Sequence, residues 1–313
     1  MDDQEAYLLL ILSDANLPTG SFVASSGLES TAAHALFNVP GPAGSDIIAF
    51  LSNTVETYAR SALPFARDAH RVTAAYASGE ITQLDVALSS LARLDALYDA
   101  TTLNDVARRA SFAQGAALLT LYTKGFTRPP LFTSAPVGAP TIGTCLPDSD
   151  EDERESRAGA LVAALKLRVR RGESDALGHL PVCWGILAAA LGLTVGKLSR
   201  LPGPSFRAIP RYTCVVHTDR GAYLHLFLHA RGVLSAAVRL NALGPYAAQQ
   251  LLLHVVRHVV DDSIKRTAHL VSGSLQDEDN PEDANDRLPA TTWPLGEILA
   301  ARHDLLHSRI FNS

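Results

Sequence analysis

The chain has 313 residues, of which 47% are hydrophobic and 19% are charged, and its formal net charge is −5 at pH 7. This balance argues against an intrinsically disordered chain and predicts at least one large buried core. The three cysteines, Cys145, Cys183 and Cys214, are an odd number without CxxC spacing. Their pattern argues against a disulfide framework and against a thiolate zinc site.

The N-terminal residues do not have the pattern of a secretory signal. They begin with acidic residues instead of a basic region, and the apolar stretch at 6–12 is short. The longest uncharged stretch, 180–196, is shorter than the roughly 20 apolar residues needed to cross a bilayer, and it contains Pro181. We therefore expect a cytoplasmic protein in which this stretch forms a buried central helix.

Helical periodicity dominates the chain. In 45–61, the apolar residues recur at intervals of three and four, which places them on one helix face: Ile47, Ile48, Leu51, Val55 and Tyr58. Similar patterns, separated by Gly and Pro, mark 81–98, 103–126, 159–170, 181–193, 222–240 and 246–268. Alternation with a period of two is nearly absent. The sequence predicts an all-α fold, a single large bundle-like domain of about eight to ten helices.

Two acidic segments interrupt the predicted body, which covers 1–271. Residues 127–157 are rich in Pro, Gly, Ser and acids and are predicted to be a mobile insertion, and 272–290 are predicted to be an acidic linker. In 291–313, leucines and isoleucines at helical spacing predict an amphipathic tail helix. Its apolar side must either fold back onto the body or dock on another chain, and the pattern alone leaves both open.

Catalytic signatures are absent from the sequence. It contains no GxxxxGKS/T phosphate loop, GxSxG elbow, HExxH pair or GxGxxG turn. Ser21 follows Gly20, but no candidate base lies near it in the sequence. We expect that the protein is not an enzyme and has no catalytic residues.

Three pairs of histidines are spaced four residues apart: His225 and His229, His254 and His258, and His303 and His307. This spacing puts both imidazoles of a pair on one side of a helix, as a nickel, copper or zinc site requires. Each pair lacks an obvious third ligand, so the sequence predicts no metal site. The pairs at 225/229 and 254/258 are weak candidates, and the second of them is predicted to be solvated.

Four short motifs occur at 13–29 (SDANLPTGSFVASSGLE), 109–115 (RASFAQG), 178–185 (GHLPVCWG) and 303–313 (HDLLHSRIFNS). Together and in this order they resemble the pattern of the UreF family of urease accessory proteins. The residues that match the first three motifs are Asp14, Pro18, Gly20, Phe22, Gly27, Glu29, Arg109, Gln114, Gly115, Gly178, His179 and Pro181. The motifs span nearly the whole chain outside the acidic segments. The sequence differs at 243–245 from many bacterial members, which have a Gln there, and its acidic insertion is long. Both features resemble a eukaryotic branch of fungal type.

The first motif has a physical interpretation of its own. Pro18 and Gly20 predict a rigid turn. Phe22 is predicted to anchor this turn in the core, and Ser25 or Ser26 to cap the following helix. We expect the first three of these residues to serve the fold.

The resemblance implies a non-catalytic, homodimeric scaffold. Such a protein binds a UreD/UreH-type accessory protein and recruits the UreG-type GTPase for nickel insertion into apo-urease, without nucleic acid, membrane or a cofactor of its own. It also implies that the tail orders on the UreD/UreH-type partner through His303, Leu306, Arg309, Ile310 and Phe311, and Glu29 is weakly expected at an interface.

Two alternatives remain open. The protein could modulate GTP hydrolysis by supplying an arginine such as Arg109 or Arg309 in trans. It could instead be a nickel-binding chaperone that uses its histidine pairs.

Overall fold

The computed structural model describes residues 3–14, 17–35, 44–127, 149–172, 176–193, 219–274 and 287–313. Every regular element in these ranges is helical and none is a strand, so the predicted all-α class is confirmed. Among the described helices, none combines the length and the apolarity that crossing a bilayer would require.

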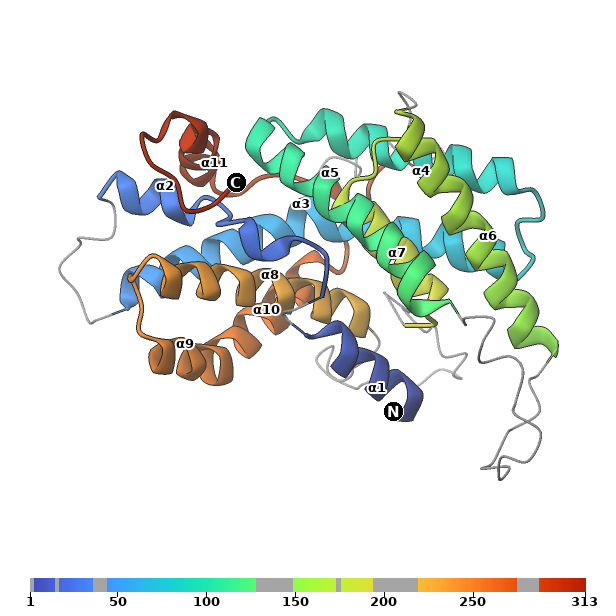
Figure 1. The fold of residues 1–313 in the computed structure, drawn as a ribbon, viewed down its shortest axis with the longest axis horizontal. Coiled ribbons are helices and arrows are strands. Elements are labelled where there is room, and N and C mark those ends of the chain that lie inside the picture. The colour runs from blue at the N-terminus through green and yellow to red at the C-terminus, as the bar shows by residue number, and fades with distance from the viewer. Residues whose placement is uncertain are drawn as a thin grey trace, which may run out of the picture.

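The 33-residue helix α3 (Ser45–Ala77) is the central element of the fold (Figure 1). Along its length it packs against α4 (Leu84–Thr101), α6 (Ser149–Arg171), α7 (Leu180–Ala190), α8 (Arg220–Arg239) and α10 (Arg257–Thr267). Its buried face carries Phe50, Leu51, Val55, Leu63 and Phe65. Of the positions that the spacing in 45–61 predicts, Ile47, Leu51 and Val55 are buried, and Ile48 and Tyr58 are half-buried. Because these helices share one core, the chain folds as one domain.

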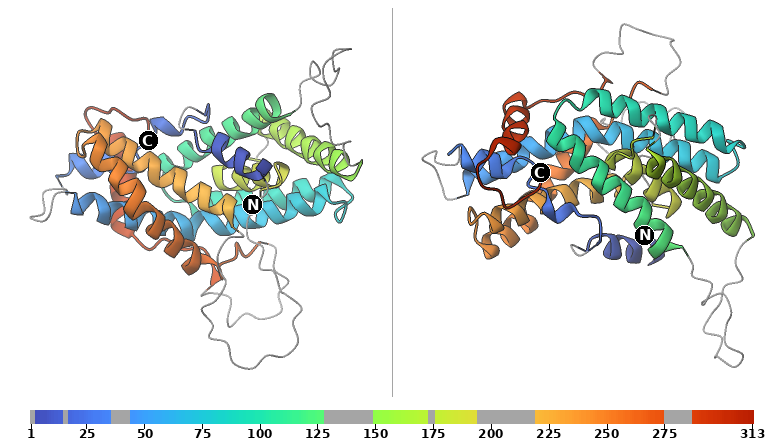
Figure 2. Two further views of the ribbon diagram at one scale, coloured as in Figure 1. Left: turned by 90° about the horizontal axis from the view of Figure 1, so that it is seen from below. Right: turned by 45° about the horizontal axis from the view of Figure 1, so that its top comes forward.

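The remaining elements surround this core. They are α1 (Asp3–Leu12), the 3₁₀ turn η1 (Ser21–Val23), α2 (Leu28–Ala33), α5 (Asp105–Leu121), the π-helical turn η2 (Tyr122–Phe126), α9 (Pro245–Leu251), the π-helical turn η4 (Leu252–Val256), α11 (Pro294–Ala301) and the 3₁₀ turn η6 (Arg302–Leu305). Figure 2 shows that α11 and α2 lie side by side, close to the C-terminus. Helix α2 therefore meets the C-terminal tail, whereas α1 and the N-terminus lie elsewhere on the molecule.

Helix α7 is the predicted buried central helix, and it crosses α3 at very short range. A Cβ atom added to Gly185 would lie 2.1 Å from the carbonyl oxygen of Ala66 on α3. Only glycine permits this approach, which lets Trp184, Ile186 and Leu187 fill the space around the crossing.

The segments predicted as insertion, linker and tail helix differ from the structure where it describes them. Residues 149–157 belong to α6, whose acidic first turns and basic last turn both favour a helix through its dipole. Ser272, predicted in the linker, is buried and donates its N–H and hydroxyl to Asp68 on α3. Residues 128–148 and 275–286 lie outside the described residues.

The tail is not one helix over 291–313. Its α-helix ends at Ala301, and the chain is extended at Leu306 after a short 3₁₀ turn. The final residues use their backbone N–H groups for bonds to the N-terminal motif, as shown below, and these groups are then not available for a continued helix.

We predict that Gly185→Ala lowers the free energy of unfolding by about 2 kcal/mol or more, since the added methyl group must push α3 and α7 apart. Gly232→Ala in α8 is the matched control, because no atom lies within 4 Å of its added Cβ. Alanine there should be neutral or stabilise by up to about 1 kcal/mol. Urea denaturation measures both variants, and equal midpoints would contradict the close crossing.

Candidate functional site

The four motifs form two clusters, and in each cluster a buried carboxylate holds backbone N–H groups. In the first cluster, Asp95 on α4 accepts hydrogen bonds from the N–H groups of Leu177 (2.7 Å), Gly178 (2.6 Å) and His179 (2.9 Å). Asp95 is 3% exposed. Its charge is therefore compensated by three donors just before α7, where a helix N-terminus also favours an anion.

The imidazole of His179 lies between two polar side chains of this cluster. Its Nδ1 is 3.1 Å from Ser111 Oγ, and its Nε2 is 3.2 Å from Asp99 Oδ1. The order Ser111–His179–Asp99 is superficially that of a nucleophilic triad, but Ser111 and His179 are buried, and Ser111 Oγ accepts the N–H of Leu180 at 2.9 Å. Burial lowers the pKa of His179. The arrangement fixes the start of α7 and exposes no nucleophile.

Two motif glycines explain why α5 can approach this turn. A Cβ atom added to Gly115 would lie 2.0 Å from the carbonyl oxygen of Gly178, and Gly178 itself has a φ of +82°. Pro181 occupies the first turn of α7, where a missing N–H costs nothing. These residues of the second and third motifs serve the fold, whereas Gln114 is half-buried on α5.

The second cluster joins the first motif to the last. Glu29 on α2 accepts the N–H of Ile310 at 2.6 Å and the N–H of Phe311 at 3.1 Å. His303 is fully buried, with its Nε2 3.2 Å from the Phe311 carbonyl oxygen and its Nδ1 3.8 Å from Glu29 Oε2. Asn312 also donates its N–H to the Val23 carbonyl oxygen at 2.9 Å. The tail is thus bound to the N-terminal motif of its own chain.

Glycine at position 27 completes this contact. Gly27 has a φ of +82°, and an added Cβ would lie 2.9 Å from the Cβ of Ala300 on α11. Gly20 likewise has a positive φ of 72° at the start of η1, as a turn residue should. Pro18 and Asp14, the other turn residues of the first motif, are exposed.

Several sequence predictions about these motifs are wrong. Phe22 is 59% exposed and does not anchor the core, because the η1 turn directs its ring outward. Glu29 is 5% exposed, so it is not itself at a free surface. The N-cap of α2 is Gly27 without a side-chain cap, so neither Ser25 nor Ser26 has that role.

The predicted partner-binding residues of the tail divide into two groups. Phe311 and His303 are buried inside their own chain, and the Arg239 guanidinium lies 4.3 Å from the centre of the Phe311 ring. They cannot contact a partner in this conformation. Arg309 and Ile310 are exposed, and Leu306 is half-buried.

Exposed apolar side chains are concentrated in this part of the chain. We define the tail surface as Leu295 and Ile298 on α11, Leu305, Arg309 and Ile310; its four aliphatic side chains are 54%, 60%, 73% and 66% exposed, respectively in chain order. The helical spacing of 295, 298 and 305 puts them on one side of α11 and η6. The sequence pattern contained this apolar stripe but did not show which of its members are free.

Arg309 of the tail surface and Arg109 on α5 share one carboxylate. Asp304 accepts from Arg109 Nη2 at 2.7 Å and from Arg309 Nη1 at 2.9 Å. The hydrogen bond from Arg109 is the main cause that lowers the pKa of Asp304. The second and fourth motifs therefore meet at this surface, and the sequence missed Asp304 as the residue that joins them.

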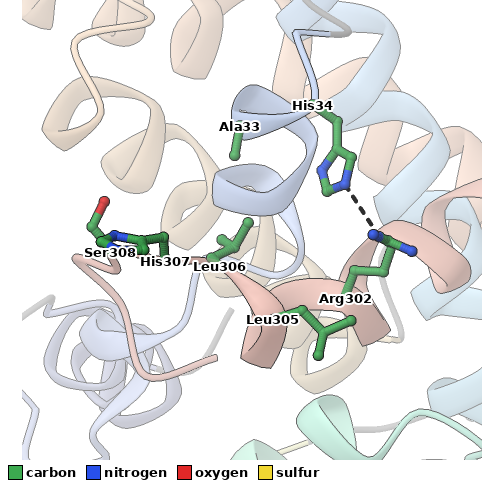
Figure 3. A pocket seen from close by; sticks show the side chains of 7 residues that line it. All are labelled: Ala33, His34, Arg302, Leu305, Leu306, His307 and Ser308. Atoms are coloured by element: carbon green, nitrogen blue, oxygen red, sulfur yellow. Dashed lines mark hydrogen bonds between the residues drawn. The ribbon is translucent and has the colours of Figure 1, made fainter.

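A hollow of about 340 Å³ opens between α2 and the tail (Figure 3). Leu305, Leu306 and Ala33 contribute apolar walls, and His34 and Arg302 lie together on one side. Arg302 Nε donates to His34 Nε2 at 3.2 Å, so the imidazole donates from Nδ1 to the Ser30 carbonyl oxygen at 2.7 Å. The hollow is continuous with Leu305 of the tail surface and could accept a side chain of a docked protein.

The histidine pair on α8 faces α3. His225 Nε2 is 3.0 Å from the Tyr58 hydroxyl, and the His229 ring stacks on the Tyr58 ring at 4.3 Å. Trp184 stacks on the other imidazole with 5.0 Å between ring centres. Burial lowers the pKa of His225 to about 3 and that of His229 to about 4. Both imidazoles are thus neutral packing groups.

The second pair, His254 and His258, is exposed on η4 and α10, as the sequence predicts. Within the part of the chain that the structure describes, no three His, Cys, Asp or Glu residues come together as metal ligands.

Sequence comparisons relate the chain to known proteins over nearly its full length. The sequence model of the UreF family matches residues 44–201 and 213–256. Urease accessory protein 6 of Cryptococcus neoformans is 36% identical, covering 99% of this chain and 98% of the relative. An uncharacterized UreF-like urease accessory protein of Schizosaccharomyces pombe is 28% identical over 99% and 97%, and urease accessory protein F of Arabidopsis thaliana is 27% identical over 96% and 90%.

We predict that the α8 histidines lower the free energy of unfolding as the pH is lowered below about 6.5. Unfolded histidines bind protons below about pH 6.5, whereas His229 and His225 resist protonation down to about 4 and about 3. On acidification, each can therefore lower the free energy of unfolding by up to about 1.4 kcal/mol per pH unit between about pH 6.5 and its folded pKa. Below its folded pKa it causes no further loss. The partly exposed His229 should contribute less.

Urea denaturation of wild type and His225→Phe between these pH values measures this effect. On acidification, the variant should show a shallower fall in the free energy of unfolding. The difference between the two curves gives the contribution of His225, because the carboxylates that titrate in the same pH range are present in both proteins. His254→Gln, an exposed position, is the control and should follow the wild-type curve. Parallel curves for wild type and His225→Phe would rule out the buried neutral imidazole.

We predict that Glu29→Ala releases the tail. The change leaves the N–H groups of Ile310 and Phe311 without their acceptor, at a cost of about 2–3 kcal/mol. Hydrogen exchange should rise at least about tenfold over 306–313. Asp304→Asn, which weakens only exposed ion pairs, should cost at most about 1 kcal/mol. An unchanged exchange rate in the tail of Glu29→Ala would show that Glu29 does not hold it.

Proposed function

Since the chain belongs to the UreF family of urease accessory proteins and has its role in urease maturation, we propose that it is a non-catalytic scaffold. It binds a UreD/UreH-type accessory protein through the tail surface and recruits a UreG-type GTPase for nickel insertion into apo-urease. It does so in the cytoplasm, binds no cofactor itself, and leaves the nickel to the assembled complex.

The exposed apolar side chains of the tail surface carry this proposal. Four aliphatic residues within 295–310 are each more than half exposed, and Asp304, next to Leu305, holds Arg109 and Arg309. Exposed apolar groups in such number are typical of protein interaction sites. Apolar anchors with arginine at the edge are typical of the energetic centres of interfaces. The relatives' names, which all contain the words urease accessory protein, support a partner within urease maturation.

The tail surface is organised before any partner arrives. Glu29, His303 and Phe311 hold the chain in place from inside, while the side chains of Arg309 and Ile310 are exposed on the outside. A preformed surface loses less conformational entropy on binding than a disordered tail would. This differs from the expectation that the tail orders only on its partner.

The two alternative functions have less support. Arg109 and Arg309 both donate to Asp304, so an arginine acting on a bound GTP would first have to leave this carboxylate. A nickel site on α8 would have to displace the Tyr58 hydroxyl and the stacked rings. The pair His254 and His258 is exposed, but two ligands are fewer than a stable site requires.

Self-association is part of the proposal. Tyr246 on α9 and Leu253 on η4 are 87% and 71% exposed, and they lie seven residues apart on the outer side of this helical pair. A second copy of the chain would cover them. Sedimentation velocity measures the resulting stoichiometry.

We predict that Ile310→Asp abolishes co-purification with the UreD/UreH-type protein, because a charge replaces an apolar side chain at the centre of the tail surface. The variant keeps the backbone N–H that binds Glu29, so its thermal stability should stay close to that of wild type. Nickel content of co-expressed urease should fall in parallel. Val86→Asp on α4, also an exposed aliphatic residue, is the matched control and should bind normally.

A point variant is required here because deletion of 291–313 would remove Leu299, His303 and Phe311 from the core and so confuse folding with binding. Wild-type binding by Ile310→Asp would exclude the tail surface as the docking site.

A further inference from the structure

A second hollow lies at the other end of α5 from the tail surface. Its volume is about 520 Å³, and its floor is formed by Ala116, Ala117, Leu121 and Gly125, with Pro18 of the N-terminal loop on one side. This volume is in the range of ligand-binding clefts, and most of the exposed lining is apolar. Arg109, by contrast, lies near the start of the same helix and points to Asp304. The two surfaces are therefore separate.

Three cations lie near the η2 end of the hollow. Lys124 is part of its lining, and α6 packs against α5 and η2 so that Lys166 Nζ donates to the Thr123 hydroxyl, next to Lys124 in the sequence. Arg170 follows one helical turn after Lys166 on α6. Burial, followed by the charges of Lys124 and Arg170, lowers the pKa of Lys166.

Two of these charges have no ion pair within the described part of the chain. Neither Lys124 nor Arg170 has an acidic partner there. Basic residues in the last turn of α6 suit the dipole of that helix, but Lys124 belongs to a different element and gains nothing from it. The π-helical turn η2, which carries Lys124, is a kind of distortion that often accompanies functional sites.

We propose that this hollow, named here the α5 groove and defined by Pro18, Ala117, Leu121, Lys124 and Gly125 with Lys166 and Arg170 at its edge, docks an acidic, apolar-faced helix of a partner protein. Apolar side chains of that helix fill the groove, and its carboxylates meet the three cations. The small side chains at 116, 117 and 125 let the helix backbone approach α5 closely.

The chemistry of the groove favours this occupant over others. No aromatic side chain lines it, so it lacks the stacking platform that single-stranded nucleic acid uses. Its apolar floor is recessed between two walls, whereas a lipid surface is bound by protruding apolar side chains. A helix with leucines on one side and glutamates on the other satisfies both the floor and the charged edge.

The test uses the full chain and two labelled helical peptides of about 18 residues. Both peptides carry the same leucine stripe, and the remaining positions are glutamate in one and lysine in the other. Fluorescence anisotropy should show binding of the glutamate peptide alone, weakened by salt. Lys124→Glu combined with Arg170→Glu should reduce its affinity at least about tenfold. Lys265→Glu on α10, an exposed lysine far along the chain, is the matched control and should have no effect.

Ala117→Phe tests the apolar part separately, because it fills the groove without changing charge and should also weaken binding at least about tenfold. Circular dichroism melts confirm that each variant is folded. The proposal is overturned if the glutamate peptide does not bind, if the lysine peptide binds equally, or if either change at the groove leaves the affinity within about twofold. It is also overturned, in favour of a second copy of this chain, if Lys124→Glu converts a dimer into a monomer.

The inference goes beyond the proposed function, because it concerns a second surface with its own partner. The peptide assay uses neither urease nor its accessory proteins. Failure of this assay and failure of the tail-surface variants are therefore distinguishable.

Discussion

The buried Glu29 carboxylate is the interaction on which the candidate site depends. It accepts hydrogen bonds from the N–H groups of Ile310 and Phe311, residues 281 and 282 positions away in the sequence, and so joins α2 to the C-terminal tail. A buried carboxylate is costly unless donors compensate it, and backbone N–H groups in an extended segment are costly unless an acceptor does. Here the carboxylate and the backbone N–H groups are paired with each other, and this pairing positions the tail surface.

The same arrangement recurs at two other places in the fold. Asp95 holds the residues before α7, and Asp68 holds Ser272 after α10. Each of these acids sits on the apolar face of a long helix, where an unpaired charge would destabilise the core. Acidic residues at core positions, such as Asp95 between Leu91 and Tyr98, are therefore a sequence signal for irregular segments that pack inside.

Several histidines that could act as acids, bases or metal ligands are instead buried packing groups, and the surfaces proposed to bind partners are mainly apolar. His179, His225 and His303 are all buried and engaged with neighbouring polar atoms. What reaches the surface instead is a set of aliphatic side chains at the tail and a basic groove along α5. This distribution suits a protein that assembles others, since recognition requires complementary surfaces and no reactive group.

The sequence by itself determined the all-α class, the central helix α7 and the family, because helical periodicity and short motifs are local properties. Only the tertiary structure decided that Phe22 is outside, that Glu29 and Phe311 are inside, and that α11 ends at Ala301. The physical reason is the same in each case. Whether a side chain is buried, or a helix continues, depends on partners that lie far away in the sequence, and a local pattern does not specify where those partners meet. The apolar stripe of 291–313 was visible, but its division between core and surface was set by the carboxylate of α2.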